Sequence, residues 1–115
     1  MTMYKDTTES EMKWLRKYAT SAYTDAAFSF IRDKGYLATY KAMAERMRSI
    51  DAQLAAFPEA EANGSKGLQY AVERAQSTLE NSAELFLAKA DKMMQLGLPV
   101  DESLVVEAAE IATNA

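Results

Sequence analysis

The chain has 115 residues, a formal net charge of −4, and neither histidine nor cysteine. It therefore lacks the usual general base, the commonest metal ligand and any thiolate nucleophile, and it can form neither a disulfide framework nor a thiolate zinc site. Because 49% of its residues are hydrophobic, we predict one packed domain over residues 1–115. Because histidine and cysteine are missing, we predict that it is not an enzyme and holds no metal and no cofactor.

The first predicted helix begins after Thr8, which has the capping-box spacing with the glutamate three residues later. Apolar residues then recur at threes and fours on one helical face, namely Met12, Leu15, Ala19, Ala22, Ala26 and Phe30. We expect this helix to end at Gly35, a natural left-handed cap. Because Phe28 and Ile31 fall on the opposite face, it stays open whether the helix is continuous, kinked or broken near residues 20–25.

A second helix is predicted over residues 37–57, where apolar residues repeat close to the seven-residue period of packed helices. The inward row is Leu37, Tyr40, Ala44, Met47, Ile50, Leu54 and Phe57. Pro58 should end the helix. Residues 58–67 then form the clearest loop, with a turn signal at Asn63-Gly64. This loop could pass for a linker, but each side alone is too small to make a comfortable core.

A third helix is predicted over residues 68–96, capped by Gly97 and followed by Pro99. Its inward row is Leu68, Val72, Ala75, Leu79, Ser82, Phe86, Ala90 and Met93. Asp101 should cap a short helix over residues 102–113. The fold class is therefore predicted to be all-α, an up-and-down helical bundle of three long helices plus a short C-terminal helix.

Charge and aromatic residues are unevenly distributed along the chain. Residues 1–50 carry nine basic and six acidic side chains, whereas residues 51–115 carry four basic and eleven acidic ones. Eight of the eleven aromatic residues lie at or before Tyr40. Trp, Tyr and Arg dominate the energetics of protein interfaces, so the first half of the chain is the candidate for a binding surface.

We therefore predict a non-enzymatic protein–protein interaction module: an adaptor, a chaperone-like factor, or an inhibitor that occludes a partner. Its size and composition would also suit a small regulatory protein encoded by a phage or another mobile element. The predicted partner-binding residues are Trp14, Arg16, Lys17, Tyr18, Phe28, Ile31 and Arg32. Trp14 and Phe28 would be the anchors, since they lie off the main apolar row, and full burial of either would refute this assignment.

Other interpretations compete with this one. The basic residues could pair with acidic residues of the third helix, so that the two halves neutralise each other. The alternative function is that of a nucleic-acid-associated regulatory factor using the basic, aromatic face of the first two helices, although a pI of about 4.8 disfavours it. A third is a bundle with an apolar ligand cavity lined by Met47, Phe86 and Met93. The carboxylate pairs Glu80/Glu84 and Glu107/Glu110 are expected to be solvated.

Apolar runs are only a few residues long, and the N-terminal segment is polar, so we expect a cytoplasmic protein that does not span a membrane. The oligomeric state stays open between monomer and homodimer. The apolar residues of the short C-terminal helix could either close the bundle or face a second chain.

Overall fold

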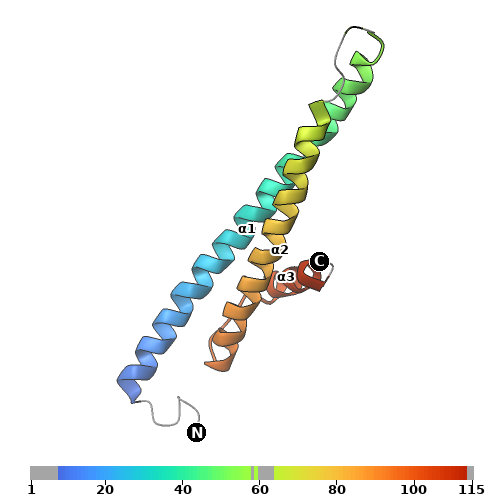
Figure 1. Cartoon of the computed structure of the whole chain (residues 1–115). Helices are drawn as coiled ribbons and strands as arrows, with labels where there is room; N and C mark the ends of the chain where they lie inside the picture. The colour runs from blue at the N-terminus through green and yellow to red at the C-terminus, as the bar shows by residue number, and fades with distance from the viewer. Residues whose placement is uncertain (1–7, 58, 60–63, 114–115) are drawn as a thin grey trace.

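The structure is a computed structural model that describes residues 8–57, 59 and 64–113. Helices α1 (Glu9–Leu54) and α2 (Gly64–Gln95) form a long antiparallel hairpin, and α3 (Glu102–Thr113) packs against the half of it that is remote from the tip (Figure 1). The molecule measures 75 × 21 × 21 Å. The all-α class is confirmed. However, the described residues form two long helices and one short helix in an extended hairpin, instead of three long helices and a short fourth.

Helix α1 runs without interruption through Gly35, where we predicted its end, and through residues 20–25. Its buried residues keep one seven-residue register throughout, namely Ala19, Ala26, Phe30, Asp33, Leu37 and Ala44. A glycine inside a helix costs about 1 kcal/mol relative to alanine. Burying a single leucine such as Leu37 stabilises by about 1.5–3 kcal/mol. Continuous packing of α1 on α2 therefore outweighs the helix-breaking tendency of Gly35.

Three helix ends carry the capping residues predicted from the sequence. Thr8 Oγ1 accepts a hydrogen bond from the Glu11 amide (3.2 Å), and the Glu11 carboxylate accepts one from the Thr8 amide (3.4 Å). Asp101 Oδ1 accepts from the Leu104 amide at the start of α3 (3.1 Å). Gly97 follows α2 with a φ of +70°. Each cap satisfies backbone groups that the helix itself leaves unpaired.

The start of α2 corrects the prediction of a loop over residues 58–67, because residues 64–67 are already helical. Asp51, near the end of α1, accepts hydrogen bonds from the amides of Gly64 (3.1 Å) and Ser65 (2.9 Å). The N-terminal cap of α2 is thus supplied by the neighbouring helix. Pro58 and Asn63, on which the predicted turn rests, lie outside the described residues.

The main core lies where all three helices meet. Phe30 and Phe86 are fully buried and stack with their ring centroids 5.6 Å apart. Leu104 and Ala108 attach α3 to this cluster. The Tyr23 hydroxyl also accepts a hydrogen bond from the Asp101 amide (2.8 Å). This core holds α3 against the half of the hairpin that is remote from the tip, and the described tip is a pair of helices without a third.

The predicted inward rows are only partly buried. Buried members are Ala19, Ala26, Phe30, Leu37, Ala44, Leu79, Phe86, Ala90 and Met93, whereas Met12, Leu15, Ala22, Met47, Leu54, Leu68, Val72, Ala75 and Ser82 are half-buried. Tyr40, Ile50 and Phe57 are exposed, against prediction. With α3 absent from the tip, no described helix is available there to cover them.

Candidate functional site

All seven predicted binding residues lie on α1, and all are exposed. Trp14 is 68% exposed, Tyr18 74% and Phe28 69%. The helical period explains this for six of them, which are out of phase with the buried row that contacts α2. Arg16 is the exception, because it lies fourteen positions before Phe30 and shares the phase of that row. Neither predicted anchor is buried, so the condition that would have refuted the assignment is not met.

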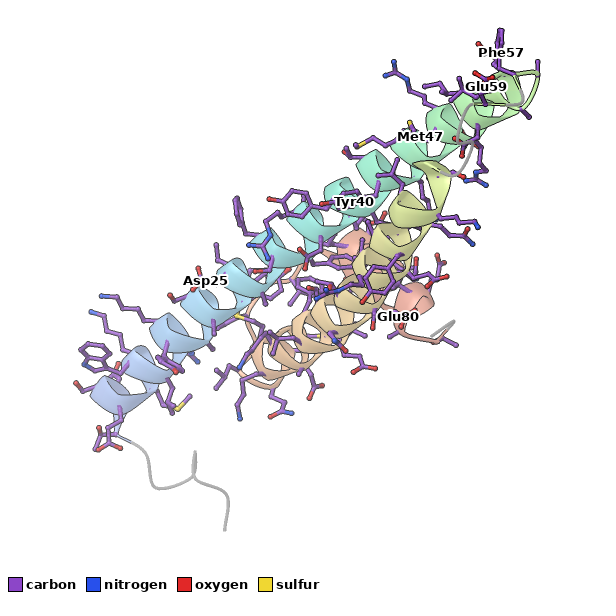
Figure 2. All side chains as sticks on the ribbon, turned by 45° about the horizontal axis from the view of Figure 1, so that its top comes forward. Asp25, Tyr40, Met47, Phe57, Glu59 and Glu80 are labelled. Carbon is purple, nitrogen blue, oxygen red and sulfur yellow. The ribbon has the colours of Figure 1, made fainter. Side chains whose placement is uncertain are left out.

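The seven residues form two groups rather than one patch. In the first, Lys17 Nζ lies 5.5 Å from the ring centroid of Trp14, and Tyr18 follows one turn after Trp14. The second group is Phe28, Ile31 and Arg32. At 1.5 Å per residue the fourteen positions from Trp14 to Phe28 span about 21 Å, and Asp25 projects from α1 between the two groups (Figure 2).

Arg16 stands apart from the other six residues. It lies two positions after Trp14, which is about 160° around a helix of 3.6 residues per turn. Lys34 is eighteen positions after Arg16, a whole number of turns, and therefore shares its side of α1. Lys34 forms an ion pair with Glu107 of α3. In the seven-residue register of α1, Arg16 belongs to the row of Phe30, Leu37 and Ala44, next to the side that carries α3 and away from Trp14.

Little of the charge on α1 is neutralised within the fold. Among the described residues, Lys34 is the α1 cation that pairs with a carboxylate of the second half, and Arg32 Nε donates to its neighbour Asp33 (3.2 Å). Lys13, Arg16 and Lys17 have no ion pair with a described carboxylate. The basic character of the start of α1 therefore remains on the surface.

The basic residues of α1 also do not form one continuous stripe. Lys17 and Arg32 lie on the side facing away from α2, whereas Arg16, Lys34 and Lys41 lie nearer the α3 side, as their helical phase requires. A stripe of cations that follows a phosphate backbone is the usual footprint of a nucleic-acid surface. The arrangement of these residues does not favour that alternative.

The apolar cavity of the third interpretation, around Met47, Phe86 and Met93, is not formed. Phe86 packs in the main core, and Met93 in a second cluster near the open end of the hairpin. Met47 lies close to Gly64 near the tip (Figure 2). The three residues are distributed along the length of the hairpin and do not surround a common space.

Two open grooves between α1 and α2 were missed by the sequence reasoning. The larger, about 380 Å³, is lined by residues that include Asp33, Tyr36, Tyr40, Tyr70, Arg74 and Thr78. The smaller, about 210 Å³, is lined by residues that include Leu15, Tyr18, Ala22, Lys89, Lys92 and Leu96. A signal for the grooves is present in the sequence, since Leu15, Ala22 and Tyr36 fall on one row with seven-residue spacing.

Asp33 is a buried carboxylate in the wall of the larger groove, with only 4% of the residue exposed. Ser82 Oγ and Arg32 Nε both donate hydrogen bonds to it. Among the described side chains no buried polar atom lacks a hydrogen-bond partner. The bonds of Asp33 therefore account for its burial as part of the helix–helix contact.

Two further features bear on chemistry and location. Within residues 8–57, 59 and 64–113, no three side chains of the metal-binding types are grouped so that they could hold an ion. Glu80 accepts a hydrogen bond from Gln76 on its own helix (3.2 Å). None of the described helices combines the length and apolar character needed to cross a membrane.

Comparison of the chain with models of protein families, with curated proteins and with solved structures gives no match.

Proposed function

We propose that this chain is a non-enzymatic protein-binding module that acts by occluding or bridging a partner through the outward side of α1. One observation carries the proposal: large apolar side chains are exposed together with cations that have no ion pair to a described carboxylate, on a helix that has a large buried face elsewhere. Trp14 and Phe28 are each more than two-thirds exposed. Large exposed aromatic residues beside cations are typical of binding surfaces.

The chemistry of this surface indicates what kind of protein surface would bind it. Residues 12–18 contain Lys13, Arg16 and Lys17 and no acidic residue. A complementary protein surface would offer apolar sockets for Trp14 and Phe28, bordered by carboxylates for Lys13 and Lys17. Because Asp25 separates the two anchor groups, each anchor would occupy its own socket. An adaptor, a chaperone-like factor or an inhibitor encoded by a phage or another mobile element could use such a surface.

Affinity capture is the first test. The chain is immobilised and used to recover proteins from native lysate with and without nuclease. We expect to recover a stoichiometric partner whose binding survives nuclease treatment. Its recovery should fall tenfold or more with Trp14→Ala or Phe28→Ala. The matched control is Met94→Ala/Val106→Ala, which removes two exposed apolar side chains from α2 and α3. Equal recovery by all variants would contradict the proposal, and loss on nuclease treatment would favour nucleic acid instead.

A second readout comes from Trp14 itself, because it is the only tryptophan in the chain. Titration of the recovered partner into the purified chain should shift the tryptophan emission to shorter wavelength, since binding would bury an indole that is now mostly in water. Lys13→Glu/Lys17→Glu should weaken this titration, and added salt should weaken it moderately. An unchanged emission spectrum at saturation would exclude Trp14 from the interface.

A further inference from the structure

On one side of the hairpin, no helix among the described residues covers α1 and α2. Lys34 contacts α3, whereas Tyr36, two positions later and about 160° around the helix, lines the larger groove. Leu15 and Ala22, in the smaller groove, belong to the same seven-residue row as Tyr36. Both grooves therefore lie on the side of the hairpin opposite α3.

Within α1 this row continues through Tyr36, Met43 and Ile50, and Phe57 follows three residues beyond the end of the helix. Tyr36 is 56% exposed, Met43 44%, Ile50 43% and Phe57 64%. A seven-residue apolar repeat is the pattern of a helix that packs against another helix along its length. Figure 2 shows Phe57 projecting outward at the tip. The row is thus a helix-packing surface that lacks its partner.

We propose that a second copy of this chain covers this side, so that two hairpins pair through the segments that extend beyond α3. An antiparallel pairing about the midpoint of the row sets Met43 against Ile50 of the partner subunit. It also sets Tyr36 against Phe57 of the partner subunit. Each exposed Phe57 ring then enters the groove between Tyr36 and Tyr70 of the other copy, and the contact is the same from both sides, as a two-fold interface requires.

The available area matches what a stable dimer needs. The side chains concerned are Tyr36, Tyr40, Met43, Ile50, Phe57 and Tyr70. At roughly 200 Å² for each whole side chain, the exposed fractions come to about 600 Å², which is the lower end of the area that a specific interface buries on each partner.

Charge also favours a second copy. Residues 36–78 hold five basic and five acidic side chains, so this segment is neutral although the whole chain carries −4. Two such segments can approach each other without net repulsion. In this arrangement the acidic residues at the other end of the hairpin and on α3 lie away from the contact between the two copies.

Sedimentation equilibrium tests the proposal on the full chain. We expect a mass of twice 12.8 kDa at concentrations on the order of 10–100 μM. Met43→Glu/Ile50→Glu should weaken dimerisation by at least about 100-fold, because it places like charges on an apolar interface. The matched control is Ala42→Glu/Ser49→Glu, with the same charges one position away on exposed sites. A monomeric wild-type chain over this range, or equal weakening by both variants, would overturn the proposal.

The antiparallel geometry has its own test, which is simple because the chain contains no cysteine. Chains carrying Met43→Cys and chains carrying Ile50→Cys are mixed and treated with a short bismaleimide. The mixture should cross-link faster than either variant alone, and faster cross-linking of Met43→Cys alone would overturn the antiparallel pairing. Dimerisation should leave Trp14 emission unchanged on dilution, so this inference and the proposed function can fail separately.

Discussion

At the scale of single residues, Gly35 and Gly97 occupy different backbone conformations. Gly35 lies inside α1, where an added Cβ would meet no described atom within 4 Å. Gly97 has positive φ and donates its amide to Met94 O (3.0 Å), and the next amide, of Leu98, donates to Met93 O (2.9 Å). This pair of bonds is a Schellman cap.

We therefore expect one substitution to have opposite effects at the two sites. Gly35→Ala should raise the free energy of unfolding by about 0.5–1 kcal/mol, because alanine loses less entropy in a helix. Gly97→Ala should lower it by about 1–2 kcal/mol, because a side chain is strained in the left-handed region. Urea unfolding followed by circular dichroism measures both. Destabilisation by Gly35→Ala would argue that the helix ends there after all.

Asp33 and Ser82 form a polar contact within an otherwise apolar helix–helix seam. Ser82→Ala should lower the free energy of unfolding by about 1.5–3 kcal/mol, because it removes a hydrogen bond to a charged acceptor. A double-mutant cycle isolates the interaction. In an Asp33→Ala background the same change should cost less than about 0.5 kcal/mol. If Ser82→Ala costs the same in both backgrounds, the two side chains do not interact.

At the scale of helices, Asp51 couples the end of α1 to the start of α2. Backbone hydrogen bonds from Ser65 and Gly64, together with the Ser65 side chain, hold the pKa of Asp51 below its ordinary value of 3.8. Because the pKa of Asp51 is lower in the folded than in the unfolded state, the cap contributes its full share to the free energy of unfolding at pH values above the ordinary pKa. The contribution is then lost as pH falls through the lowered pKa. Acid should therefore weaken the junction at the tip.

The comparison that tests this is wild type against Asp51→Asn, whose amide oxygen still accepts a hydrogen bond but does not titrate. Wild type should lose more stability than Asp51→Asn between about pH 7 and pH 2.5. Asp101, whose pKa is also lowered by bonds from Leu104 and Ser103, contributes equally to both proteins and cancels in the difference. Parallel pH profiles for the two proteins would mean that the Asp51 carboxylate does not cap α2 in solution.

The helix ends that could be predicted are those whose caps are local in sequence. Thr8, Gly97 and Asp101 each act on groups within a few residues. The start of α2 could not be predicted, because its cap is thirteen residues away on the other helix. The significance of Gly35 was misjudged for the same reason. Whether a glycine ends a helix depends on what its neighbours bury, and that is decided by α2.

For the candidate site too, the features that depend on one helix could be predicted from the sequence, and those that depend on two helices could not. The exposure of Trp14 and Phe28 follows from helical phase alone, because both lie off the row that faces α2. The larger groove could not be anticipated. It needs Tyr70 and Arg74 of α2 beside Tyr36 of α1, and the pairing register that brings them together is held by contacts between residues far apart in sequence.

At the scale of the whole molecule, the continuity of α1 determines the shape. A helix of 46 residues is about 69 Å long at 1.5 Å per residue, which accounts for most of the 75 Å extent. The radius of gyration is 21.0 Å, whereas a compact domain of this length would have about 13 Å. A bundle folded at Gly35, as the sequence alone suggested, would be close to the compact value.

Small-angle scattering therefore distinguishes the two folds without any label. The measurement is best made on Met43→Glu/Ile50→Glu, so that association does not enlarge the particle, with sedimentation confirming a single chain. We expect a radius of gyration near 21 Å and a distance distribution with a long tail toward 75 Å. A value near 13–15 Å at unchanged helicity would mean that α1 folds back on itself. The tip would then no longer extend beyond α3, and the apolar row that it presents would be buried within one chain.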